Sequence, residues 1–355
     1  MPDRTSQDAI DWDLALATAR RFAPSGPDLS PDDARAAVVD LRALAREAVA
    51  PVRETTLLVA PESSPAVVVD RGAWAASNVE GMRAVLDRWD ALGERTEAAP
   101  AVVRSLGSRG TALQLGAVLA WLSTKVLGQF EIFAVGRGEP GRLLLVAPTI
   151  VQVQQQLGVD ARDFRLWVCL HEETHRVQFG AVPWLADHLT DRITALLAAS
   201  DLGTREMLGR IVAFLYAMIR SVRSDSDVSV VEALQTPEQR EIFDEITGVM
   251  SLLEGHADVV MDEVGPAIVP SVMEIRERFS VRREQSGAVD SVARRLLGMD
   301  AKMRQYSQGA EFVRHAVGAL GQPGFNRVWD APANLPSREE ILHPQSWVDR
   351  MAASP

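Results

Sequence analysis

Residues 171–175 read His-Glu-Glu-Thr-His, a pentad whose residue types and spacing are suited to metal-assisted hydrolysis. Positions four apart share one face of an α-helix, so His171 and His175 can hold one metal ion between them. Glu172, next to the first histidine, can then reach a water on that ion and take its proton. The pentad therefore predicts a zinc site in which Glu172 is the catalytic base.

The residues around the pentad predict the helix that must position it. Asp160 is a suitable N-cap, and Asp163 can supply the reciprocal bond of a capping box. Gly180 offers a C-terminal stop, with Pro183 shortly beyond it, which gives a helix of about 18 residues. The alternative is that the two histidines contact only protein and water. A capped helix carrying the whole pentad favours the metal site over that alternative.

A second helix is predicted about 80 residues after the pentad and supplies candidates for the third ligand. Thr236 can act as its N-cap, Pro237 suits its first turn, and Gln239 completes a capping box. Apolar residues then recur at helical spacing: Ile242, Ile246, Val249, Leu253 and Val260. The segment is thus predicted to be a largely apolar helix, so the ionisable side chains within it are candidates for a functional role.

Three polar residues of this second helix bear on the metal. Glu254 and Asp258 lie four apart and share a face, whereas His256 points elsewhere. We therefore expect Glu254 to be the third ligand, with Asp258 accepting the ring N–H of His171 or His175, since ligand histidines commonly have such a carboxylate partner. The alternative assigns His256 as the third ligand and Glu254 as the outer group.

These motifs together resemble a known family. The pentad followed by Leu-Glu-Gly-His-Ala-Asp at 253–258 is similar to the zincin-like metallopeptidases, formerly known only as a domain of unknown function. Some members are labelled as associated with deazaflavin coenzyme biosynthesis. The resemblance extends to Val126-Leu-Gly-Gln-Phe130 and to the tail from Leu335-Pro336 through Pro344-Gln-Ser-Trp347. It departs at Phe130, where relatives carry tyrosine, so a phenol is missing at that position.

The resemblance implies a mainly α, zincin-like helical metalloprotease fold, with a short β-hairpin or small sheet next to the pentad helix. Two apolar runs flanking a glycine-rich turn at 136–141 predict that hairpin. Its edge would either pair with an extended peptide or merely cover the core. We expect a single domain over 1–355. Its predicted parts are an N-terminal helical part (1–128), a metal-site part (129–264) and a C-terminal helical part (265–355), and the predicted strands are 130–135 and 142–147.

Composition limits the class of protein and its partners. With 355 residues, of which 47% are hydrophobic, the chain can bury a large core. A net charge of −11 argues against nucleic acid or an anionic membrane as partner. Cys169 is the only cysteine in the sequence, so the chain cannot form an intrachain disulfide. The first residues lack a signal-peptide pattern, and no apolar run reaches about 18 residues, so we expect a cytoplasmic protein.

The predicted function is zinc-dependent hydrolysis of a peptide, with Glu172 as the base. Tyr306 is the first candidate for a further donor to the developing oxyanion, with Arg314 and His315 of the same predicted helix behind it. Two alternatives stay open: an amide or ester hydrolase acting on small molecules, and a zinc-containing binding protein without turnover. The sequence leaves the substrate and the oligomeric state open.

Overall fold

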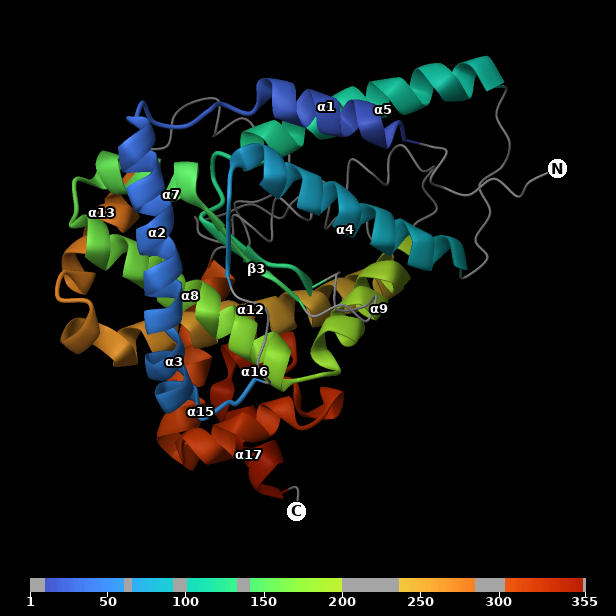
Figure 1. Ribbon diagram of the computed structural model, residues 1–355. Helices are drawn as coiled ribbons and strands as arrows, with labels where there is room; N and C mark the ends of the chain where they lie inside the picture. The colour runs from blue at the N-terminus through green and yellow to red at the C-terminus, as the bar shows by residue number, and fades with distance from the viewer. Residues whose placement is uncertain are drawn as a thin grey trace.

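Helices packed around a small sheet make up the computed structural model, which describes residues 10–60, 66–91, 101–132, 141–199, 236–284 and 304–353 (Figure 1). The predicted mainly α fold with a small sheet is confirmed. The helices are α1 Trp12–Phe22, α2 Pro31–Glu47, α3 Val49–Thr56, α4 Arg71–Ala91, α5 Ala101–Leu122, α7 Ala147–Leu157, α8 Ala161–Ala181, α9 Leu185–Ala198, α12 Pro237–Ile268, α13 Val272–Glu284, α15 Arg304–Asn326, α16 Arg338–Leu342 and α17 Pro344–Ala353, with 3-10 turns η2 Arg327–Trp329 and η3 Pro332–Asn334.

Helix α8 carries the pentad and begins where the sequence predicts. The Asp160 carboxylate accepts from the Asp163 backbone N–H at 2.9 Å, which satisfies one of the free donors at the helix start. The predicted reciprocal bond is absent, because the Asp163 carboxylate accepts instead from the backbone N–H and hydroxyl of Ser271, at 2.9 and 2.8 Å. Asp163 therefore ties the start of α8 to the segment that joins α12 and α13.

Helix α12 also begins at its predicted cap. Thr236 and Gln239 form both bonds of a capping box, and Pro237 occupies the first turn. Regular helix geometry is interrupted at Gly265, whose φ of 47° is left-handed, immediately before Pro266. Residues 237–264 thus form one long regular helix, and Glu254 lies near its middle.

The sheet has three short strands in the order β1-β3-β2. Strand β3 (Leu143–Val146) pairs antiparallel with β2 (Gly128–Phe130) and parallel with β1 (Val67–Val69). The predicted second strand is confirmed in outline, but the first was placed too late, since β2 ends at Phe130 instead of starting there. Residues 133–140, which include most of the predicted turn, lie outside the described residues. Strand β1 was not predicted at all.

Strand β2 is held in one register by contacts on both of its faces. Phe130 stacks on Phe179 of α8, with ring centroids 5.6 Å apart. Gln129 points the other way, where its Oε1 accepts from Trp74 Nε1 at 2.7 Å and from Asn78 Nδ2 at 3.2 Å. Because alternate strand residues face opposite sides, Gly128 shares the Phe130 face and is turned towards α8.

Among the described residues, the buried hydrophobic side chains form two clusters, and α12 contributes to both. Leu252, Leu253 and Val259 belong to the cluster that also contains α1, α4, α5 and α15 residues, whereas Val260, Met261 and Val264 belong to the one built around α2, α7 and α8. Within the described ranges, no helix combines the length and the apolar run needed to cross a bilayer. The predicted division at residues 128 and 264 stays a prediction.

A pair of glycines lets α12 and α15 approach closely. A Cβ atom on Gly255 would lie 2.2 Å from the carbonyl carbon of Gly309, and one on Gly309 would lie 2.1 Å from the Ser251 carbonyl oxygen. Neither position therefore accepts a side chain without moving a backbone. This contact fixes the position of α12 at Gly255, the residue next to Glu254.

Candidate metal centre

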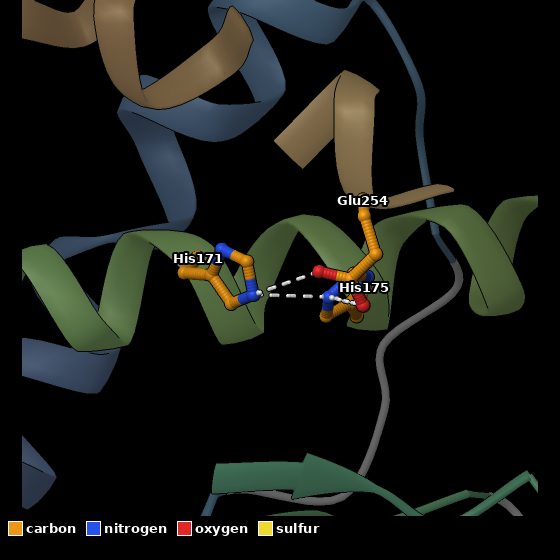
Figure 2. Close-up of side chains that lie close together, drawn as sticks. All are labelled: His171, His175 and Glu254. Atoms are coloured by element: carbon orange, nitrogen blue, oxygen red, sulfur yellow. Dashed lines mark hydrogen bonds and ion pairs between the residues drawn. The ribbon is translucent and has the colours of Figure 1, made fainter. Parts of the chain in front are cut away.

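Two helices bring His171, His175 and Glu254 together. Both histidines project from α8 and Glu254 projects from α12 into the same space (Figure 2). The two Nε2 atoms lie 3.2 Å apart, and the Glu254 oxygens lie 3.7 Å from His171 Nε2 and 3.6 Å from His175 Nε2. One ligand atom from each residue falls within 4.8 Å of the other two. The three residues that the sequence singled out are thus neighbours in space.

The donor set and its spacing fit a zinc ion. A four-coordinate zinc ion with bonds of roughly 2 Å keeps its ligand atoms about 3.3 Å apart. The two Nε2 atoms are 3.2 Å apart, and each of them lies within 3.7 Å of one of the two Glu254 oxygens. Two imidazoles and one carboxylate leave one coordination position without a protein ligand, as catalytic sites require. The side chains of His171, His175 and Glu254 are 26%, 13% and 23% exposed. Solvent can therefore reach the group.

Glu172 lies beside this group but is buried, with 6% of its surface exposed. Burial raises the pKa of Glu172 to about 7, while the nearby His175 opposes this rise and the Glu254 carboxylate adds to it. Glu172 is thus a buried carboxyl group next to the three candidate ligands.

Gly128 of β2 packs directly against Glu172. A Cβ atom at Gly128 would lie 2.5 Å from Glu172 Cδ and 2.8 Å from Oε1. The carboxyl group therefore occupies the space that any other residue at 128 would fill. Because β2 is anchored on its other face by Trp74 and Asn78, the strand cannot easily retreat.

We expect Gly128→Ala to displace the Glu172 carboxyl group and to lower kcat on the order of 100-fold, since misplacement of a catalytic group by about 1 Å has effects of this size. Zinc content should be unchanged, because the atoms nearest to a Cβ at Gly128 all belong to Glu172, which is not one of the three candidate ligands. Steady-state kinetics and elemental analysis of the variant measure the two quantities.

Gly318→Ala is the matched control for this substitution. Gly318 lies in α15, and a Cβ atom there would meet nothing within 4 Å. The control should keep full activity and gain about 0.5–1 kcal/mol of stability, because alanine favours a helix interior. Equal activity of the two variants would show that Gly128 has no part in placing Glu172.

The ring Nδ1 atoms of the two histidines face different partners. His171 Nδ1 lies 3.3 Å from the sulfur of Met261, and His175 Nδ1 lies 2.9 Å from Oε1 of Gln178. The neighbour of His175 Nδ1 is thus Gln178 of the same helix and not Asp258. The sequence analysis did not identify Gln178. The +3 spacing on α8 was the signal that could have found it. A role for Asp258 beside His171 stays a prediction.

His256 is not part of the ligand group. It is 1% exposed, its Nδ1 lies 3.0 Å from Gln178 Nε2, and its ring packs 5.3 Å from Phe325 and 5.6 Å from Trp329. Burial lowers the pKa of His256 to about 3, and the nearby His175 acts in the same direction. The geometry therefore places His256 behind His175, as a neutral imidazole bonded to Gln178.

Two of the predicted oxyanion donors, Arg314 and His315, form contacts with other polar residues. The side chain of the third, Tyr306, which lies in the first turn of α15, is outside the described residues. Arg314 pairs with Asp262 at 2.6 Å, and His315 Nε2 lies 3.0 Å from Gln345 Oε1. Both of these contacts lie at the exposed surface, and neither of them involves a residue of the candidate metal centre.

The fold and the site define a helical protein with a candidate metal centre of the H-E-x-x-H type. The sequence model of the family described as zincin-like metallopeptidase matches residues 10–348. Since this match spans nearly the whole chain, the protein belongs to that family. Membership implies a metal, typically zinc, and the His171, His175 and Glu254 group is where the residues fit one.

A solved structure resembles the whole chain. It is described as the crystal structure of "a putative hydrolase with a novel fold" from Chloroflexus aurantiacus. The two proteins are 29% identical and superpose with a TM-score of 0.67, over 98% of this chain and 100% of the other. No curated protein matches the chain significantly.

Proposed function

We propose that the protein is a zinc-dependent hydrolase, and specifically a metallopeptidase, with Glu172 as the general base. The observation that carries this proposal is the convergence of His171, His175 and Glu254 beside a buried Glu172. Family membership and the description of the similar solved structure as a hydrolase support it. A structural zinc site has no need of a carboxylate held next to its ligands.

His171, His175 and Glu254 would hold the zinc ion. When bound, the ion supplies Lewis acidity, which makes a water more acidic and polarises the carbonyl that is attacked. Glu172 accepts a proton from the attacking water as the new C–O bond forms. It then returns that proton to the amine nitrogen as the C–N bond breaks, so the carboxylate is regenerated. The contact with Gly128 keeps the carboxyl group in place throughout.

The edge of β2 supports a peptide substrate over a small molecule. Strand β2 pairs with β3 on one side, and no described strand pairs with its other side. Gly128 of this strand contacts Glu172, so an extended peptide added along the edge opposite β3 would pass near the proposed base. Main-chain hydrogen bonds to an edge strand bind peptides without demanding a particular side chain.

Metal content and peptide cleavage test the proposal together. The purified full-length chain should contain about one zinc ion by elemental mass spectrometry, as a single catalytic site requires. It should also cleave members of a synthetic peptide library read by mass spectrometry, lose this activity with 1,10-phenanthroline and regain it with added zinc. A chain that takes up no metal even when zinc is supplied would refute the proposal. Cleavage of p-nitrophenyl esters with no peptide cleaved would favour a small-molecule hydrolase instead.

A further inference from the structure

The amide of Gln178 bridges His175 and the neighbouring helix α12. Its Oε1 lies 2.9 Å from His175 Nδ1, while its Nε2 donates to the Leu253 carbonyl oxygen at 3.0 Å and lies 3.0 Å from His256 Nδ1. The Gln178 side chain is fully buried and His256 is 1% exposed. These hydrogen bonds therefore form without competition from bulk water.

The Leu253 carbonyl decides which way the amide points. A backbone carbonyl oxygen only accepts hydrogen bonds, so the atom of Gln178 that faces it must be the NH2 group. The second hydrogen of that group then faces His256 Nδ1, which accepts it when His256 carries its own hydrogen on Nε2, a buried atom with no hydrogen-bond partner among the described residues. This arrangement leaves Oε1 as the only Gln178 atom that can face His175. The orientation of the amide is thus set by α12 and not by His175.

The direction of the His175 bond follows from this orientation. An amide oxygen cannot donate, so His175 Nδ1 must carry the hydrogen. In a neutral imidazole the other nitrogen, Nε2, then has a free lone pair. Nε2 is the atom that lies 3.2 Å from His171 Nε2 and 3.6 Å from Glu254 Oε1. The nitrogen that faces the candidate ligand group is therefore the one kept free of a proton.

We propose that Gln178 is a positioning residue that, oriented by the Leu253 carbonyl, holds His175 as its Nδ1–H tautomer and so prepares Nε2 to bind the metal. The inference rests on the proposed metal site but not on the hydrolytic step. It is needed because a free neutral imidazole prefers to carry its hydrogen on Nε2. A ligand histidine without an acceptor at Nδ1 would then present the protonated nitrogen for most of the time.

The test begins with the tautomer of His175 in the metal-free wild-type chain, read from long-range proton–nitrogen NMR correlations of the imidazole rings. The expected pattern is a protonated Nδ1 for His175 and a protonated Nε2 for His256. A protonated Nε2 on His175 would overturn the proposal without any variant. This readout does not depend on whether the protein hydrolyses anything.

Gln178→Met keeps the length of the side chain but removes both hydrogen-bonding groups. His175 should then shift towards the Nε2–H tautomer, and zinc affinity measured by competition with a chelating dye should fall about 10- to 100-fold. Unchanged tautomer and affinity in this variant would overturn the proposal. If the wild-type chain binds no zinc, the proposed function fails, while the tautomer measurement still decides whether Gln178 sets the tautomer of His175.

Two further variants separate positioning from folding. Gln178→Glu keeps an acceptor for His175 but places an oxygen against the Leu253 carbonyl, so we expect a lower melting temperature with retained tautomer and zinc affinity. His256→Phe leaves the Leu253 carbonyl in place and should keep the His175 tautomer. Zinc affinity that falls in parallel with the melting temperature across all three variants would indicate a merely structural role.

Discussion

Replacing Glu172 with glutamine is expected to lower kcat for peptide hydrolysis by about 10²- to 10⁴-fold while zinc content stays at the wild-type level. Glutamine has nearly the same shape but cannot accept the proton of the attacking water. Glu172 is not among the three residues whose ligand atoms converge, so the variant should still bind the metal. Steady-state kinetics and elemental analysis of the same preparation measure both quantities.

Glu173→Gln is the matched control, because it makes the same chemical change at the adjacent residue. Glu173 is buried, with its carboxylate paired to Arg176 at 2.6 Å. Burial raises the pKa of Glu173, and the hydrogen bond and charge of Arg176 oppose this rise. The control should lose some thermal stability but keep most of its activity and all of its zinc. Full activity in Glu172→Gln would refute the assignment of the base.

Glu254→Ala is expected to weaken zinc binding by more than about 100-fold. Removing a hydrogen-bond partner of a ligand, by comparison, costs roughly 10- to 100-fold in affinity. The substitution removes the only carboxylate in the ligand group and leaves two imidazoles. His256→Phe should change zinc affinity by no more than about tenfold, because the hydrogen bond of His256 is to Gln178 and not to one of the candidate ligands. Competition titrations with a zinc-binding dye give both dissociation constants.

The order of these two effects decides between the alternatives that the sequence left open. A larger loss in His256→Phe than in Glu254→Ala would make His256 the third ligand and Glu254 the outer group. Melting curves of the two variants serve as the check on folding. Comparable melting temperatures with the expected order would leave Glu254 as the ligand.

Local sequence signals predicted the two helices that carry the candidate site. The N-caps at Asp160 and Thr236 and the 3.6-residue periodicity depend only on residues within a few positions of each other, so they can be read without the rest of the chain. The same periodicity placed His171 and His175 on one face and separated Glu254 from His256. These residue choices followed from helix geometry alone.

The sheet was predicted less well because its pairing is not local. Strand β1 is only three residues long, and its partner β3 begins more than 70 residues later. No periodic pattern marks so short a run. The register of β2 likewise depends on Trp74 and Asn78 of α4 and on Phe179 of α8, which are distant in sequence. The position of Gly128 against Glu172 is a consequence of that register.

By itself, then, the sequence determined the helical class of the protein, the helices that bear the pentad and Glu254, and the residue types able to bind a metal. Tertiary structure alone decided that Glu254 meets both histidines, that the Gln178 amide turns its oxygen towards His175 Nδ1, and that Asp163 accepts hydrogen bonds from Ser271 and not from its own helix. The physical reason is that hydrogen-bond partners are chosen by packing between helices. The position of α12, and with it that of Glu254, depends on contacts such as Gly255 against Gly309 of α15, which no local pattern encodes.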